Sequence, residues 1–275
     1  MPPNRIGILA GGGMLPVLLG EACRQRQQPF HVIVFEGQGD ASAFADDSHA
    51  VIRIGAAGAA VKNLKEAGCD TLVMAGAIHR PSMFELRPDW WGIKFFASSG
   101  AAVLGDDGLL TALVAALEAE GFTVIGADTL LPDYLMPKGV LGHVNPGALE
   151  TEDINAAIRA ARDLGARDIG QAVVVHNAQI IIEEDADGTD AMLRRLTERK
   201  NTGGVLAKTL KPGQERRVDL PTVGPDTIAH AHAAGLTGVV IEAGNAFLLD
   251  HIETVNKADD LGLFLIGADA EGHWQ

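Results

Sequence analysis

Short apolar runs separated by helical patterns constrain the fold of this chain more than any other feature of its sequence. In the first half of the chain we expect strands at residues 5–10, 31–35, 50–54, 71–77 and 122–127. These runs are mostly apolar instead of alternating with polar residues, which is typical of parallel strands buried on both faces. Because helical patterns lie between them, the sequence predicts an α/β fold with a helix-covered parallel sheet.

A break in this pattern divides the chain into two parts. Residues 131–144 hold two prolines and two glycines without clear periodicity, a composition typical of a linker. We therefore expect a Rossmann-like N-terminal domain at residues 1–132, a linker at 133–140 and a C-terminal domain at 141–275. A hairpin expected at residues 172–184, among helices and further strands, predicts a mixed α/β fold for the second domain.

Composition excludes several classes of protein. A net charge of -14 argues against general binding to nucleic acid, which needs a basic surface. The two cysteines, Cys23 and Cys69, are typical of buried thiols in a reducing compartment, not of a disulfide framework. Since no segment reaches about 18 unbroken apolar residues, we expect no membrane-spanning helix and a cytoplasmic protein.

Basic residues nevertheless gather at residues 194–217, where eight Lys or Arg accompany two Glu. Such an island is either a solvated surface or a phosphate site. In a phosphate site, Lys208 and Arg216 would offset oxyanion charge, while Asp219 and Asp226 would orient water or hold a metal. Asp226 follows a Gly-Pro pair at an expected helix start, so simple helix capping is its alternative role.

Familiar catalytic motifs are missing from the sequence. It contains no H-E-x-x-H, no G-x-x-x-x-G-K-[ST] loop and no G-x-S-x-G elbow. Catalysis would then depend on carboxylates, basic side chains and Mg²⁺, which prefers oxygen ligands and substrate phosphates.

Gly11, Gly12 and Gly13 follow the first expected strand and open a helix, where a phosphate finds backbone N–H groups and a favourable dipole. Pro16 stands where a dinucleotide fingerprint needs its third glycine. Glu36 ends the second strand and resembles the acid that holds a ribose in dinucleotide sites. A nucleotide-dependent oxidoreductase therefore remains an alternative to a site for some other ligand.

Further polar residues follow other strands of the same sheet. His79 and Arg80 come after the run at 71–77, and Asp106 precedes a helical pattern. Loops beyond the carboxyl edge of an open parallel sheet converge on one crevice. These residues are thus candidates for ligand binding, although capping also explains an acid at position 106.

An aromatic cluster occupies residues 89–96 (DWWGIKFF), whereas the whole chain is only 5% aromatic. Trp90, Trp91, Phe95 and Phe96 would either pack in the core or provide an apolar surface for lipid or membrane. Indole rings suit a boundary between hydrocarbon and water.

Seven stretches together carry a family resemblance. They are IGILAGGGMLP (6–16), AGAIHRPSM (75–83), GDDGLL (105–110), GQAVVV (170–175), DGTDAMLRR (187–195), VLAKTLKPGQERRVDLPTVGPDTI (205–228) and GLTGVVIEAGNAFLLD (235–250). In this order they resemble the LpxI family, the UDP-2,3-diacylglucosamine pyrophosphatases of lipid A biosynthesis in some Gram-negative bacteria. The resemblance covers nearly the whole chain.

The resemblance implies Mg²⁺-dependent hydrolysis of UDP-2,3-diacylglucosamine to UMP and 2,3-diacylglucosamine 1-phosphate, with water attacking the phosphorus on the sugar side. It implies a homodimer, two domains with the lipid held between them, and peripheral contact with the cytoplasmic face of the inner membrane. The family's essential aspartate carries over to Asp226, which becomes the expected metal ligand, with Asp219 as a second catalytic carboxylate. The implied substrate-binding residues are Gly11, Gly12, Gly13, Ala75, Gly76, His79, Arg80, Asp106, Gly188, Thr189, Asp190, Lys208, Arg216, Thr222 and Gly224.

Two other classes of function stay open at this point. One is the nucleotide-dependent oxidoreductase. The other is a non-catalytic protein that binds a lipid or a nucleotide sugar.

Overall fold

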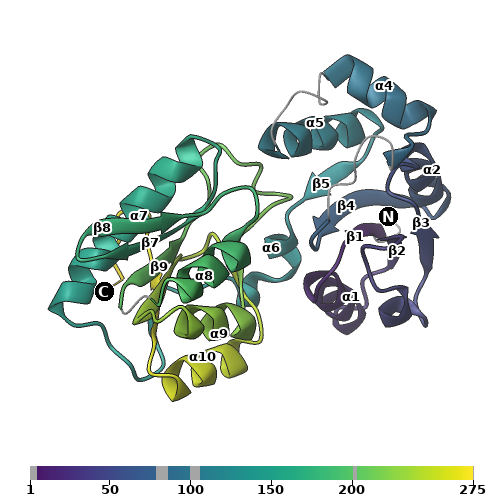
Figure 1. Cartoon of the computed structure of the whole chain (residues 1–275). Coiled ribbons are helices and arrows are strands. Elements are labelled where there is room, and N and C mark those ends of the chain that lie inside the picture. Colours follow the sequence, from purple (N-terminus) through teal and green to yellow (C-terminus); the bar gives the residue numbers. More distant parts are fainter. Residues whose placement is uncertain (1–4, 79–85, 100–105, 201–202, 275) are drawn as a thin grey trace. The chain divides into compact units, whose positions relative to one another are not determined.

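The computed structural model describes residues 5–78, 86–99, 106–200 and 203–274. The chain forms two compact units (Figure 1). The N-terminal unit comprises Met1–Pro132 together with Glu215–Asp219, and the C-terminal unit comprises Asp133–Gln214 and Leu220–Gln275. The segment expected as a linker, residues 133–140, enters the C-terminal unit and runs into β6 (Gly139–Leu141).

The N-terminal unit is built on a five-stranded sheet in the order β3-β2-β1-β4-β5, and every pairing is parallel. The strands are β1 (Arg5–Ala10), β2 (Phe30–Phe35), β3 (His49–Ile52), β4 (Cys69–Ala75) and β5 (Thr123–Ile125). Ile8, Ile33 and Leu72 are fully buried in this sheet. The predicted N-terminal parallel sheet is confirmed.

Helices cover both faces of this sheet (Figure 1). They are α1 (Leu15–Gln25), α2 (Ala57–Glu66), α4 (Trp90–Ser99), α5 (Asp106–Ala119) and the short α6 (Ala127–Leu130), with a 3₁₀ turn η1 (Ala41–Phe44). One core cluster joins strand residues such as Leu9 and Leu72 to Leu64 of α2 and Val114 of α5. Cys23 and Cys69 are buried and unpaired, and burial raises the pKa of each thiol to about 11.

One carboxylate fixes the starts of two helices in this unit. Asp89 Oδ2 accepts the backbone N–H groups of Gly58 (2.8 Å) and Ala59 (3.3 Å) in α2, and its Oδ1 accepts that of Gly92 (2.9 Å) in α4. The first N–H groups of a helix have no intrahelical partner. Asp89 therefore caps α4 and ties it to α2.

Replacing Asp89 with alanine is expected to lower the free energy of unfolding by about 1–3 kcal/mol, because N–H groups at two helix ends lose their acceptor. Urea unfolding followed by circular dichroism measures the change. Asp46→Ala, which removes an exposed acid of the same unit, is the control and should leave stability within about 0.5 kcal/mol. Equal midpoints for the two variants would contradict the capping role.

The N-terminal unit also contains a short segment from far along the chain. Val218 packs against the core cluster of α2, α5 and the sheet. Arg216 Nη2 lies 3.0 Å from Asp128 Oδ2, and Arg217 Nη1 lies 2.7 Å from Glu118 Oε1. One apolar contact and two ion pairs thus attach residues 215–219 to this unit.

The C-terminal unit is a six-stranded mixed sheet in the order β6-β13-β11-β9-β7-β8. Its other strands are β7 (Ala172–His176), β8 (Gln179–Glu183), β9 (Val205–Lys208), β11 (Gly238–Glu242) and β13 (Phe264–Ala268). β9, β11 and β13 are parallel, whereas β6, β7 and β8 pair antiparallel. The predicted mixed fold and the hairpin turning at Asn177 are confirmed.

Helices cover both faces of this sheet as well (Figure 1). α7 (Ala148–Ala166) packs on one face, where Ile158 and Leu164 meet Val173, Val175 and other strand residues. α8 (Thr189–Glu198), α9 (Pro225–Ala233) and α10 (His251–Asp260) cover the other. A separate parallel pair, β10 (Thr222–Val223) and β12 (Phe247–Leu248), precedes α9 and α10.

Across the described ranges, no helix combines the length and the apolar composition that crossing a bilayer requires.

Candidate functional site

Two loops cross at the carboxyl edge of the N-terminal sheet, where β1 and β4 end. A Cβ atom on Gly11 would lie 2.6 Å from the carbonyl oxygen of Ala77, and one on Gly76 would lie 2.5 Å from the carbonyl oxygen of Gly12. Gly76 also has a φ of +90°, which side chains rarely tolerate. Glycine is therefore required at both positions for the backbones to approach.

At this crossing, backbone N–H groups of residues 11 and 12 form hydrogen bonds within the protein. The N–H groups of Gly11 and Gly12 donate to the carbonyls of Ala75 (2.9 Å) and Ala77 (2.8 Å). Gly13 is exposed, has a φ of +88°, and a Cβ atom there would meet nothing within 4 Å. A ligand at this edge would thus meet Gly13 and the first turn of α1, where helix N–H groups lack intrahelical partners.

The other predicted residues of this edge are only partly described. Asp106 is the first residue of α5, in agreement with the predicted helix start. His79 and Arg80 lie outside the described residues.

A second set of predicted residues meets in the C-terminal unit, at the carboxyl edge of β9. Lys208 ends β9, and its ammonium donates to the carbonyl of Thr222 at 3.3 Å. Thr222 opens β10, and Gly224 immediately precedes α9. Lys208, Thr222 and Gly224 therefore lie together beside the N-terminus of α9.

Asp226 is the second residue of α9, as predicted, and its side chain is exposed. Pro225 occupies the first helical position, where a missing N–H costs nothing. Gly224 has an extended backbone (φ −153°) and no side chain to cap the helix. The helix N-terminus is therefore open to an anion or a metal–phosphate group, with Asp226 at its rim.

The start of α8 carries Gly188, Thr189 and Asp190, which play different parts. Thr189 is buried, and its hydroxyl donates to Glu184 at 2.5 Å. Glu184 Oε2 also accepts the N–H groups of Gln171 and Ala172, so Thr189 belongs to a structural network. Gly188 has a φ of +86° and precedes the helix.

Asp190, in contrast, is exposed. Its Oδ1 lies 3.2 Å from His230 Nδ1 of α9. This contact joins α8 to α9 and leaves the carboxylate facing solvent.

Two arginines of the basic island, Arg216 and Arg217, belong to the N-terminal unit and pair with its acids. Arg216 is bonded to Asp128 through both Nε (3.3 Å) and Nη2 (3.0 Å). Arg217 bonds Glu215 and Glu118, which raises the pKa of its guanidinium and lowers that of the Glu215 carboxyl. Asp219 donates its backbone N–H to the carbonyl of Glu215 at 3.3 Å. The charges of Arg216 and Arg217 are thus balanced within the fold.

One buried polar group at the sheet edge escaped the sequence interpretation. Glu242 ends β11 at 3% exposure and accepts hydrogen bonds from Arg162 (3.3 Å), the N–H of Leu210 (3.1 Å) and Asn245 (2.6 Å). An acid that ends an apolar strand, within the stretch GVVIEAG, is the signal that could have revealed it. Thr209, next to Lys208, is fully buried, and within the described ranges its hydroxyl has no hydrogen-bond partner.

Carboxylate oxygens, the ligands that a hard divalent cation prefers, stand at the starts of two helices of the C-terminal unit. Asp226 and Asp190 present exposed carboxylates at the starts of α9 and α8. Mg²⁺ binds one or two carboxylates and completes its coordination with water and substrate phosphates. Asp226, the predicted metal ligand, therefore has the exposed carboxylate that Mg²⁺ binding requires.

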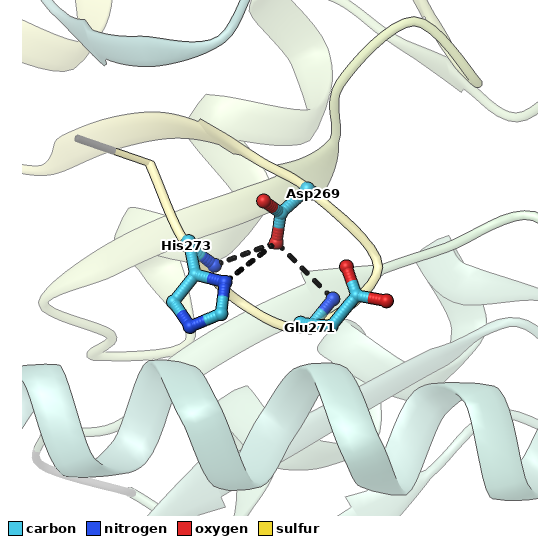
Figure 2. A group of neighbouring side chains, drawn as sticks. All are labelled: Asp269, Glu271 and His273. Carbon is cyan, nitrogen blue, oxygen red and sulfur yellow. Dashed lines mark hydrogen bonds and ion pairs between the residues drawn. The ribbon is translucent and has the colours of Figure 1, made fainter.

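Another acidic group, Asp269, Glu271 and His273, lies after β13 (Figure 2). Asp269 Oδ1 accepts the N–H groups of Glu271 (3.2 Å) and His273 (2.8 Å), and Oδ2 accepts the Lys138 ammonium at 2.9 Å. The bonds from Lys138 and from the backbone of His273 lower the pKa of Asp269 to about 2. This cluster is a hydrogen-bonded turn tied to Lys138, so it provides no argument for a metal.

The Asp269 carboxyl is expected to titrate near pH 2, and Lys138→Ala should move its midpoint up toward the ordinary value of 3.8. A depressed pKa in the folded state stabilises the fold above the ordinary pKa, and this contribution disappears as pH falls toward 2. Carbon-detected NMR of the carboxyl gives the midpoint. An unchanged midpoint in Lys138→Ala would show that the lysine does not hold the carboxylate.

A cavity of about 500 Å³ opens on the α7 face of the same sheet. Its lining is Ala156, Arg159, Ala160, Asp163, Arg167, Val175, Ala178, Ile180 and Glu183. None of the predicted site residues lines it. Lys208 lies on the opposite face, because Leu206, two residues earlier on the strand, packs with the α8–α10 cluster.

Two family models match the chain in succession. The LpxI N-terminal domain family matches residues 5–134, and the LpxI C-terminal domain family matches residues 137–266. The UDP-2,3-diacylglucosamine pyrophosphatase LpxI of Caulobacter vibrioides is 40% identical, over 98% of this chain and 99% of its own length.

Two solved structures show much weaker likeness, at 13% identity. An N5-carboxyaminoimidazole synthase from Aspergillus clavatus has a TM-score of 0.26, covering 70% of this chain and 43% of its own. A UDP-glucose-4-epimerase from Stenotrophomonas maltophila has a TM-score of 0.30, covering 98% and 95%. Likeness at this level supports no inference, whereas the two domain matches together span nearly the whole sequence. The chain belongs to the LpxI family.

Proposed function

We propose that this chain hydrolyses UDP-2,3-diacylglucosamine to UMP and 2,3-diacylglucosamine 1-phosphate in a Mg²⁺-dependent reaction of lipid A biosynthesis. The observation that carries the proposal is the 40% identity, from end to end, to a protein named as the pyrophosphatase of that substrate. The open N-terminus of α9 in the C-terminal unit, with Lys208 and Asp226 beside it, supports a diphosphate site.

The residues of this site have different roles in the cleavage of a phosphoanhydride. Phosphoryl transfer leaves the protein mainly positioning and electrostatics. The Lys208 ammonium and the N–H groups of the first turn of α9 offset the charge of the phosphate oxygens. Asp226 positions the attacking water or holds the cation.

In the proposed reaction, a water oxygen bonds to the phosphorus on the sugar side, and the bond from that phosphorus to the bridging oxygen breaks. The bridging oxygen leaves with UMP, and the proton of the water passes to solvent. Mg²⁺, when bound, would polarise the phosphoryl oxygens and stabilise the leaving phosphate.

Hydrolysis of UDP-2,3-diacylglucosamine in ¹⁸O-labelled water, with and without a chelator, tests this function. We expect release of UMP, label in the acylated sugar phosphate, and loss of turnover with chelator that added Mg²⁺ restores. Label in UMP would contradict attack on the sugar-side phosphorus. Absence of UMP release would favour a binding protein.

We also propose that the chain acts in the cytoplasm as a homodimer with peripheral contact to the inner membrane. β8 supports association because it is an edge strand of the C-terminal sheet and carries Ile180 at 52% exposure. Sedimentation velocity of the full chain over a range of concentrations tests the dimer. A single monomeric species throughout would refute it.

A further inference from the structure

The helix α4 presents two different faces. Its inner face carries Trp91 and Phe95, whose rings stack at 5.7 Å, and Phe95 is only 8% exposed. The indole N–H of Trp91 donates to Glu120 Oε1 at 2.8 Å. This half of the aromatic cluster belongs to the core, which was one of the two roles considered for it.

The outer face of α4 consists of Trp90, Ile93 and Ala97. Trp90 is 80% exposed, Ile93 is 48% exposed, and Ala97 is also exposed. Spacings of three and four residues place these side chains on one face of the helix. Three aligned, exposed apolar side chains form a surface, whereas a single exposed apolar residue needs no explanation.

Among the described residues, the exposed charged side chains of α4 and of the three residues before it are cationic. The sequence of α4, WWGIKFFASS, contains Lys94 and no acid, and Arg87 is exposed just before the helix. Two carboxylates that the structure describes at the base of the helix are already engaged. Asp89 accepts three backbone N–H groups, and Glu120 bonds Lys65 and Trp91. In a chain of net charge -14, this face is complementary to an anionic surface.

We propose that the outer face of α4 docks on the surface of an anionic phospholipid bilayer. An indole suits the boundary between headgroups and hydrocarbon, Ile93 would enter the acyl region, and Lys94 and Arg87 would meet lipid phosphates. A ten-residue helix lies along such a surface and does not span it. The outer face of α4 would thus be the surface through which the protein contacts the membrane. This inference rests on the proposed function, in which the substrate is a membrane lipid.

Vesicle cosedimentation without substrate tests the docking separately from hydrolysis. The vesicles contain phosphatidylcholine with phosphatidylglycerol, or phosphatidylcholine alone. The double variant Trp90→Ala/Ile93→Ala should partition at least about tenfold more weakly, because it removes most of the apolar area that would be buried. Lys94→Glu should weaken partitioning by at least about fivefold on the anionic vesicles alone. The control Ile252→Ala, which truncates a 78%-exposed side chain of α10, should bind like the parent.

Quenching by brominated phospholipid identifies the inserted side chain. The emission of the parent protein should be quenched on binding, and Trp90→Phe should lose this quenching while keeping most of its affinity. Absence of vesicle binding by the parent, or equal binding by the double variant, would overturn the proposal. So would slower hydrolysis of micellar substrate by the double variant with unchanged vesicle binding, because the face would then hold the substrate's own acyl chains. Vesicle binding without UMP release would contradict the proposed function only.

Discussion

Asp226→Ala is expected to lower turnover by at least about 10³-fold, because the variant loses the carboxylate that positions water or holds the cation. The side chain is exposed and lies in the first turn of α9. Its removal should therefore cost less than about 1 kcal/mol of stability. Steady-state release of UMP measures the first effect, and thermal unfolding measures the second.

Two further variants separate chemistry from helix electrostatics. Asp226→Asn keeps the shape and removes the charge, so it should be almost as inactive as the alanine variant. Glu253→Ala removes an exposed acid from the first turn of the neighbouring helix α10, so it should reproduce the small stability change with normal activity. Near-normal turnover in Asp226→Ala would remove this residue from the mechanism.

Lys208→Met is expected to lower kcat/KM by about 10²–10³-fold, because one cation that offsets phosphate charge is lost. Lys208 ends β9, and its ammonium reaches the carbonyl of Thr222 beside α9. The matched control is Lys211→Met, since Lys211 follows three residues later and pairs with Asp168 at 3.0 Å. Measurement of kcat/KM for both variants at saturating Mg²⁺ tests this prediction. Equal losses in the two variants would mean that general basicity of the loop, and not Lys208, supports catalysis.

The sequence predicted the helices and strands better than it predicted the long-range contacts of their side chains. Apolar runs identified the strands of both sheets except β6, which lies in the stretch expected as a linker. The hairpin turns at Asn177, where this residue and Ala178 have φ values of 50° and 58°. Positive φ at both positions is typical of a two-residue hairpin turn. Strands and hairpin turns depend on residues that are adjacent in the sequence, so local sequence patterns predict them.

Long-range pairing explains where the interpretation of the basic island was incomplete. Arg216 and Arg217 meet Asp128 and Glu118, which are 88 and 99 residues away in the chain. The spacing of residues 194–217 does not indicate that Asp128 and Glu118 are the partners of these arginines. Thr189, expected to bind substrate, is likewise buried against Glu184, so its role depends on a network that only the folded sheet creates.

The aromatic cluster shows the same limit on a smaller scale. Adjacent positions of a helix face different directions, so Trp90 and Trp91 have opposite environments. The composition of residues 89–96 suggested one cluster with one role, whereas the helix divides it between core and solvent.

The attachment of residues 215–219 to the N-terminal unit has a consequence for biosynthesis. Domains of a nascent chain generally fold as units, the N-terminal one first, while translation continues. Here the first unit acquires Val218, Arg216 and Arg217 only after the ribosome has made most of the second. In a polypeptide that ends at residue 132, Asp128 and Glu118 would lack these arginines. The N-terminal unit would therefore be incompletely folded and a substrate for chaperones.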